Sequence, residues 1–305
     1  MRRSISPWLL LALVTAVCAA ALVGVASIRA RGQTEASLIE RLPVDSTAIV
    51  YMDFAALRRA GITAALAAPE GEREEEYRAF VDGTGFEYTR DLDSVIFASS
   101  PRGRFFLARG RFDWGRLSDY VRSRGGVCHI TFCRTEGSRP DRQVSYFPLE
   151  RDLMALAVSP DEWAASELQV RKPQEIDAPK KPVWAIFTAA ALAGGDDLPK
   201  GARLLAAAVE GADRVLLTAG PAPGGVEIGL DAACRSDSSA ADLKDRLSKL
   251  TALVNELLRS EGHQPDPSDL SGILAGGAFE QKGTHVVGSW PVSKHFLESI
   301  AGVGL

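Results

Sequence analysis

The sequence is poor in the residues and motifs on which most enzymatic chemistry depends. It contains only 4 histidines in 305 residues. No Gly-x-Ser-x-Gly elbow, His-Glu-x-x-His zinc motif or Gly-x-x-x-x-Gly-Lys-Ser/Thr phosphate loop occurs in it. The one comparable glycine cluster, residues 220–225, is interrupted by prolines, which lack the backbone N–H donors that a phosphate cradle needs. We therefore expect a non-enzymatic protein with no catalytic residues, no cofactor and no metal.

The sequence also lacks a strong excess of charge of either sign. Its formal net charge is −4, whereas a general nucleic-acid binder needs broad positive charge to displace counterions. We therefore predict no nucleic-acid partner. A content of 46% apolar and 24% charged residues is typical of an ordinary globular protein.

Only one long hydrophobic run is present, from Trp8 to Ile28, and it carries no charged side chain. As a helix it would reach roughly 31 Å, which matches the hydrocarbon core of a bilayer. We predict a transmembrane helix or uncleaved signal anchor over 8–28, a cytoplasmic tail over 1–7 and a polar tether over 29–42. The globular part then lies outside the cytoplasm. The alternative is a signal peptide cleaved near Val25-Ala26-Ser27, which would release a secreted or periplasmic protein.

Cysteine is scarce, and its pattern leaves the pairing open. Outside the hydrophobic run the cysteines are Cys128, Cys133 and Cys234. In a regular strand, Cys128 and Cys133 would lie roughly 16 Å apart, beyond the reach of a disulfide. They can pair only if residues 128–133 turn or bulge, and otherwise Cys234 is a possible partner for one of them. Cys128, His129 and Cys133 together resemble a set of metal ligands. Neighbouring strand residues point to opposite faces, however, so we predict no metal site there.

The order of the predicted elements occurs twice along the chain. A strand, a helix, a hairpin and a second helix follow one another in residues 43–171 and again in residues 183–305, although the amino acids themselves do not visibly repeat. Residues 172–182, rich in proline and charge, are the predicted linker. We predict an α+β fold of two similar subdomains, each a mainly antiparallel sheet with helices on one face.

Three local predictions concern the first subdomain. The apolar face of residues 72–82 predicts a helix that ends at Gly83. Residues 127–134 are predicted to form one short strand. A helix is predicted to begin at Pro160, because proline suits the first turn.

The clearest helix is predicted over Ser239 to Glu261. Its apolar residues step by four and three along one stripe: Leu243, Leu247, Leu250, Val254 and Leu257. The ordinary interpretation is a helix packed on its own sheet. The alternative is a coiled-coil seam that joins two copies of the chain.

Two stretches give the chain a family resemblance. LIERLPVDSTAIVYMDFAALR, which contains Asp53, is followed by GFEYTRDLDSVIFAS, which contains the pair Asp91-Leu92. With the hydrophobic run, these stretches make the chain similar to a family of bacterial proteins of unknown function that have a single N-terminal membrane segment. The resemblance covers mainly residues 38–112. It implies α+β character and a place in the bacterial inner membrane, and it carries no catalytic residues.

The most distinctive polar feature is a local excess of arginine over acidic residues. The arginines are Arg102, Arg104, Arg109, Arg111, Arg116, Arg122 and Arg124. Such a surface suits an acidic protein, an anionic envelope polymer or lipid headgroups.

The sequence therefore favours a membrane-anchored, extracytoplasmic module that binds protein or cell-envelope components. One alternative is a carrier of an apolar ligand, held in a groove between the two halves. A less favoured alternative is an envelope hydrolase with residues drawn from distant segments, such as Asp53, Ser99 and His285.

Overall fold

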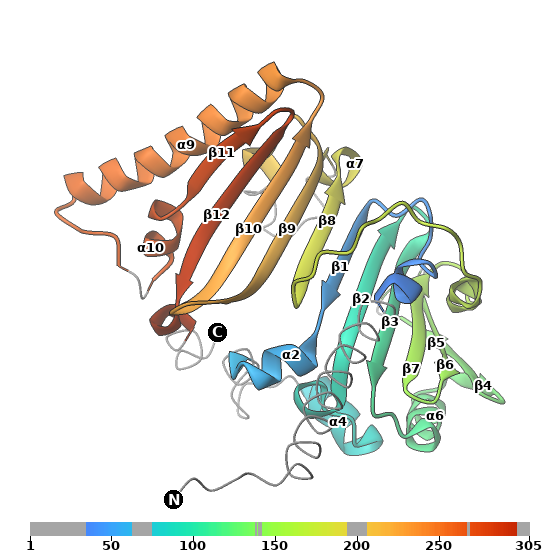
Figure 1. Ribbon diagram of the computed structural model, residues 1–305. Coiled ribbons are helices and arrows are strands. Elements are labelled where there is room, and N and C mark those ends of the chain that lie inside the picture. The colour runs from blue at the N-terminus through green and yellow to red at the C-terminus, as the bar shows by residue number, and fades with distance from the viewer. Residues whose placement is uncertain are drawn as a thin grey trace, which may run out of the picture.

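One antiparallel sheet runs through the whole of the described chain (Figure 1). The computed structural model describes residues 35–62, 75–137, 139, 142–193, 206–266 and 269–297. From one edge to the other, the strands are β11 (Ala278–Lys282), β12 (His285–Ser293), β10 (Gly225–Cys234), β9 (Ala212–Ala222), β8 (Val183–Thr188), β1 (Ala48–Met52), β2 (Leu92–Ser100), β3 (Gly103–Gly110), β7 (Leu153–Ser159), β6 (Gln143–Glu150), β5 (Phe132–Glu136) and β4 (Val127–His129). The fold is thus α+β with a mainly antiparallel sheet, as the sequence predicts.

Helices connect the strands and cover parts of both faces of the sheet. Residues 35–39 are helical. The further helices are α2 (Phe54–Arg59), α4 (Glu75–Thr84), α5 (Tyr88–Asp91), α6 (Trp114–Ser123), the 3-10 helix η2 (Ala164–Gln169), α7 (Ala189–Ala193), α9 (Asp237–Ser260) and α10 (Leu270–Ala275).

The centre of the sheet joins the two halves of the chain. β1 pairs with β2 on one side and with β8 on the other, and Tyr51 lies opposite Trp184 in the second ladder. The two rings stack at 5.5 Å between centroids, and Trp184 is completely buried. The first half therefore shares its core with a strand of the second half.

Alternation along the strands gives the sheet two faces. The face that carries Tyr51, Ile96, Leu107 and Trp184, here called the Trp184 face, is covered by residues 35–42 and by η2. The opposite face is covered by α6 at the β4 end, and by α9 at the β11 end through Ala240, Leu243 and Leu247.

The prediction that helices lie on one face is therefore wrong for the first half. Its strands are apolar on both sides: Ile96 and Ala98 of β2 lie on the Trp184 face, while the neighbouring Phe97 packs against Phe106 on the other. A sheet that is apolar on both faces needs a layer on each.

The predicted linker exists as a connection but lies against the body of the protein. Ile176 and Ala178 pack on the core, and the Gln174 side chain donates to the Leu42 carbonyl at 2.9 Å. At its end, the Asp53 N–H donates to the Pro182 carbonyl at 2.7 Å. The connection is thus fixed to the first half along its length.

Two helix predictions need correction. α4 continues through Gly83 to Thr84, and Gly85, with φ of +73°, follows it. Gly83 instead permits close packing, because a Cβ there would lie 2.5 Å from the Tyr120 ring of α6. Pro160 begins no α-helix: the chain turns and then forms the 3-10 helix η2.

The predicted single strand over 127–134 is also wrong, because this segment is the hairpin β4–β5. Cys128 lies directly opposite Cys133, and the two form a disulfide with a Cα–Cα distance of 4.1 Å. The turn therefore brings together residues that a straight strand would separate. Cys234 is a buried free thiol.

The predicted membrane segment, residues 8–28, lies outside the described residues, as do residues 1–7 and residues 29–34 of the predicted tether. The rest of the predicted tether is not a free polar segment, because Leu38, Ile39 and Leu42 are buried in the core. Among the described residues, no helix is both long and apolar enough to cross a bilayer.

Candidate functional site

The seven arginines of the predicted anionic-partner face do not gather at one place. Arg102 and Arg104 lie at one end of the β2–β3 hairpin, whereas Arg109 and Arg111 lie at the other. Arg104 and Arg111 are seven positions apart, which corresponds to roughly 23 Å of extended chain. Arg116, Arg122 and Arg124 are on or beside α6.

Most of these arginines are engaged within the protein. Four form ion pairs: Arg102 with Asp45 and Glu167, Arg109 with Glu150 and Asp152, Arg111 with Asp91, and Arg122 with Asp119. Arg116 donates to the carbonyl oxygens of Asp82 and Gly83, and Arg124 lies 5.4 Å from the centre of the Tyr120 ring. Local pairing accounts for much of the positive charge that the sequence concentrates here.

The three residues of the hydrolase alternative are far apart. Asp53 caps α2 by accepting the Ala56 N–H at 2.7 Å. Ser99 lies opposite Ala48, at the other end of β1 and roughly 16 Å away. His285 is on β12, four strands from β1, which is roughly 19 Å. A catalytic centre made of Asp53, Ser99 and His285 is therefore wrong.

No cluster of three or more metal-ligating side chains occurs within the described part of the chain. His285 Nδ1 lies at hydrogen-bond distance, 2.6 Å, from the Asp231 carboxylate on an exposed part of the sheet. The thiol of Cys234 is not activated, because burial raises its pKa and the nearby Asp213 raises it further.

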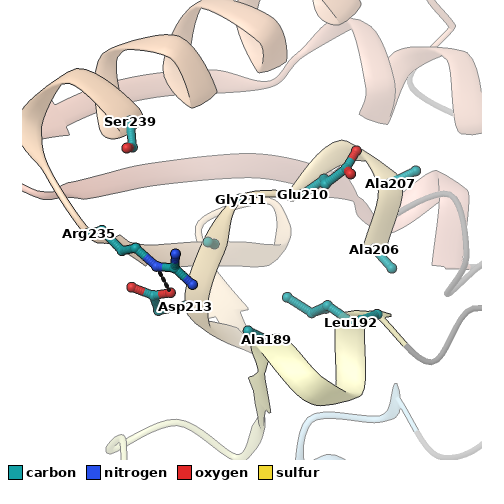
Figure 2. A pocket seen from close by; sticks show the side chains of 11 residues that line it. Ala189, Leu192, Ala206, Ala207, Glu210, Gly211, Asp213, Arg235 and Ser239 are labelled. Atoms are coloured by element: carbon teal, nitrogen blue, oxygen red, sulfur yellow. Dashed lines mark hydrogen bonds and ion pairs between the residues drawn. The ribbon is translucent and has the colours of Figure 1, made fainter.

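The described cavities are each lined by one half of the protein. The largest, about 750 Å³, is in the second half and is shown in Figure 2. Ala189 and Leu192 of α7 form part of its apolar wall, and the ion pair of Asp213 with Arg235, at 2.9 Å, also lines it. A groove between the halves, as the carrier alternative requires, is not among these cavities of the described chain.

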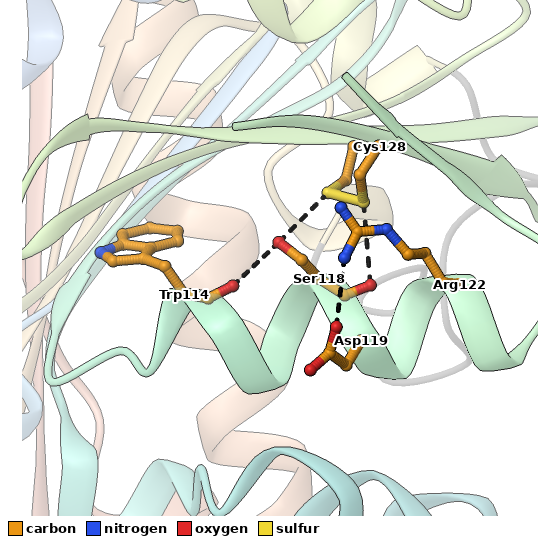
Figure 3. Close-up of a disulfide and its surroundings, with 6 residues drawn as sticks. Trp114, Ser118, Asp119, Arg122 and Cys128 are labelled. Carbon is orange, nitrogen blue, oxygen red and sulfur yellow. Dashed lines mark hydrogen bonds and ion pairs between the residues drawn. A yellow bond between two sulfur atoms is a disulfide. The ribbon is translucent and has the colours of Figure 1, made fainter. Parts of the chain in front are cut away.

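The feature that stands out is the β4–β5 hairpin at the free edge of the sheet (Figure 3). Its disulfide lies against α6, with the sulfur atoms of Cys128 and Cys133 at 3.8 Å and 3.6 Å from the Ser118 carbonyl and hydroxyl oxygens. At the tip, Ile130 has a φ of 55°, a left-handed conformation that a β-branched residue rarely adopts. The tip residue thus adopts a strained backbone conformation in the two-residue turn between β4 and β5.

The side chain of Ile130 is 95% exposed, which is unusual for a large apolar residue in a folded domain. Alternation in the ladder places Val127, His129, Phe132 and Arg134 on one side of the hairpin, with Cys128 and Cys133 on the other. Val127 is also strongly exposed. The hairpin therefore exposes Val127 and Ile130 to solvent, while Phe132 packs on the core and the disulfide lies against α6.

Trp163 extends this apolar surface from the segment before η2. Its ring stacks on Phe132 at 4.8 Å, and the Arg134 guanidinium lies 5.0 Å from the ring centre. Arg134 also pairs with Glu162. Although these contacts hold it in place, Trp163 remains 45% exposed. We call Val127, Ile130, Phe132, Arg134 and Trp163 the edge patch.

Sequence reasoning missed the edge patch entirely. The only signal for it is the Cys-x4-Cys spacing, which becomes informative once the segment between the cysteines is known to turn. Trp163 is distant in sequence from the hairpin, and only the pairing of β5 with β6, and of β6 with β7, brings it there.

No protein-family model matches the chain, and no curated protein matches it. Among solved structures, the chain is similar to TP0453 in crystal forms I, III and IV, with TM-scores of 0.46, 0.48 and 0.47. The sequence identities are 9%, 10% and 11% for forms I, III and IV, and the alignments cover 86–87% of this chain and 96–97% of the other. A likeness at this level says nothing about activity.

Proposed function

We propose that this protein is a non-enzymatic binding module that docks another protein through the edge patch, outside the cytoplasm. The hydrophobic run over residues 8–28 anchors it in the bacterial inner membrane. The observation that carries the proposal is the disulfide-closed hairpin, which exposes Ile130 at its tip and carries Phe132, on which the partly exposed Trp163 stacks.

The composition of the edge patch supports a protein partner. Aromatic residues and arginine are enriched where binding energy concentrates in protein interfaces, and lysine and glutamate are depleted. Trp163 and Arg134 are already held by their contacts with Phe132 and Glu162, so that binding would cost little side-chain entropy.

The disulfide supports the extracytoplasmic location. Structural disulfides form and persist in oxidising compartments and are rare in the cytosol. The pairing of Cys128 with Cys133 therefore agrees with a globular part outside the inner membrane.

We further propose that residues 43–171 and 183–305 are two copies of one unit. Outward from the central β1–β8 pair, the strand orders are β1-β2-β3-β7-β6 and β8-β9-β10-β12-β11. When β4 and β5 are set aside, the two series match: the first three strands follow chain order, and the last two are exchanged in both. The β4–β5 hairpin is then an addition to the first copy, which agrees with a specific role for it.

Photo-crosslinking in the producing cell tests the docking proposal. A benzophenone amino acid at position 130 is expected to give a discrete adduct, and the same probe at Val44, which is 61% exposed elsewhere, is the matched control. Trp163→Ala should remove most of the adduct, because truncating such an anchor weakens binding by about 10–30-fold. Equal labelling from both positions, or no adduct at position 130, would contradict the proposal.

A thiol assay tests the location independently. Rapid alkylation in acid-quenched cells should leave Cys128 and Cys133 unmodified until a reductant is added. If both thiols are alkylated without reductant, the protein resides in a reducing compartment and the extracytoplasmic proposal is wrong.

A further inference from the structure

The C-terminal half of α9 exposes a row of leucines. Ala240, Leu243 and Leu247, in the first half of the helix, are buried on the sheet. Further along, Leu250, Leu253 and Leu257 are 45%, 52% and 53% exposed. Figure 1 shows why: α9 crosses the sheet obliquely and continues beyond β11, the edge strand.

These leucines lie on a different side of α9 from the residues that pack on the sheet. At about 100° per residue, Leu250, Leu253 and Leu257 fall within an arc of roughly 60°, next to the sheet-facing residues. α10 packs on the opposite flank, where the Asn255 side chain donates to the Ala275 carbonyl at 3.1 Å. α10 therefore does not cover the leucine row, which lies on the outer side of the helix.

The spacing of the leucines is that of the a and d positions of a heptad, with Leu250 and Leu257 at a and Leu253 at d. Lys249 and Glu256 then both occupy g positions, beside the row. Both are exposed, and among the described residues the structure gives neither of them an ion pair.

The charges on this face are self-complementary. If two copies of α9 pack antiparallel, with Leu250 of one beside Leu253 of the other, the g positions of the two helices face each other. Lys249 of one copy then lies opposite Glu256 of the other, and two-fold symmetry repeats this pair. In a parallel pairing, by contrast, each g position faces the e position of the partner's next heptad, so Lys249 would lie opposite Val254 and Glu256 opposite Glu261, which gives no attractive pair.

We propose that α9 is the dimerisation surface of this protein, and that two copies pack their leucine rows antiparallel around a two-fold axis between Leu250 and Leu253. The interface consists of about two heptads per copy, which is small. Interfaces that bury less than about 1,200 Å² belong to the weak or transient class, so the dimer should dissociate in the micromolar range.

Sedimentation velocity on the full-length protein in detergent, over a wide concentration range, measures the equilibrium. The wild type should shift from monomer to dimer as its concentration rises. Leu253→Asp should weaken association at least tenfold, because it places a charge at the centre of the interface. The matched control Val170→Asp, at a 58% exposed site outside α9, should leave association unchanged.

Charge exchange separates this interface from any association through other segments. Lys249→Glu and Glu256→Lys should each weaken the dimer, and the double variant should restore it, because the opposite charges face each other again. All these sites are exposed, and circular dichroism should show unchanged helix content.

Each of three results would overturn the proposal. The first is a wild-type protein that stays monomeric at every concentration. A monomer that binds lipid through the same leucines counts as this result. The second is a dimer that tolerates Leu253→Asp. The third is a double charge variant no better than the single ones.

Discussion

At the scale of single residues, Asp91 is the most constrained carboxylate of the described chain. It is 7% exposed, accepts the Glu87 N–H at 3.0 Å, and forms ion pairs with Arg90 at 2.6 Å and Arg111 at 3.0 Å. Burial by itself would raise its pKa, but the hydrogen bonds from Arg90 and Glu87 and the charges of both arginines outweigh it and lower the pKa. The ionised form therefore stabilises the fold.

The sign of the pH dependence follows from that lowered pKa. The contribution of Asp91 is complete above its unfolded pKa of about 3.9 and is lost as the pH falls through the lower folded value. Asp91→Asn should lower the free energy of unfolding by about 1–2 kcal/mol at pH 7, a modest amount because both arginines are largely exposed. Below pH 4 the variant should lose less stability than the wild type. Urea unfolding at pH 7 and at pH 3 measures both. Asp119→Asn, at a 78% exposed partner of Arg122, is the control and should change the stability by less than about 0.5 kcal/mol; equal effects would contradict this account.

Part of this arrangement is local in sequence, because Asp91 accepts the N–H of Glu87, as aspartate at a turn or cap commonly bonds to nearby backbone. Its ion pair with Arg111 depends on the β2–β3 hairpin bringing residues 20 positions apart together, and no local pattern contains that information.

At the scale of elements, the β4–β5 hairpin depends on its disulfide. β4 is only 3 residues long and pairs on one side only, so its ladder alone is weak. Closing a loop of this size removes unfolded-state entropy worth about 2 kcal/mol. Cys128→Ala/Cys133→Ala should lower the free energy of unfolding by about this amount. Reductant should destabilise the wild type equally and leave the double variant unchanged; a wild type indifferent to reductant would contradict the prediction.

Sequence patterns failed at this hairpin for a physical reason. A tight turn usually contains glycine or asparagine where φ is positive, but here that position is Ile130. Its β-branched side chain favours a strand, so residues 127–134 were predicted to continue straight. By contrast, α9 was predicted well, because its apolar residues keep the helical period and Ser236 caps its start.

At the scale of the whole molecule, the repeated order of elements was visible in the sequence, but the join between the halves was not. The proline-rich segment 172–182 suggested separate subdomains. In the structure, β8 completes the core of the first half through Trp184 and Ile186, while a second core lies under α9. Pairing between β1 and β8 is a contact across about 135 residues, which local periodicity cannot reveal.

Because the core is shared, we predict that a destabilising substitution in β8 also destabilises the first half. Trp184→Ala should cost about 3–5 kcal/mol, since it leaves a cavity where a fully buried ring stacks on Tyr51. Hydrogen exchange should then show reduced protection of the amides of Ile96 and Leu107, which lie in the first half but line the same core. Trp163→Ala, at a 45% exposed ring, is the matched control and should leave this protection intact. If Trp184→Ala reduces protection only in β8 and β9, the halves fold independently despite their continuous sheet.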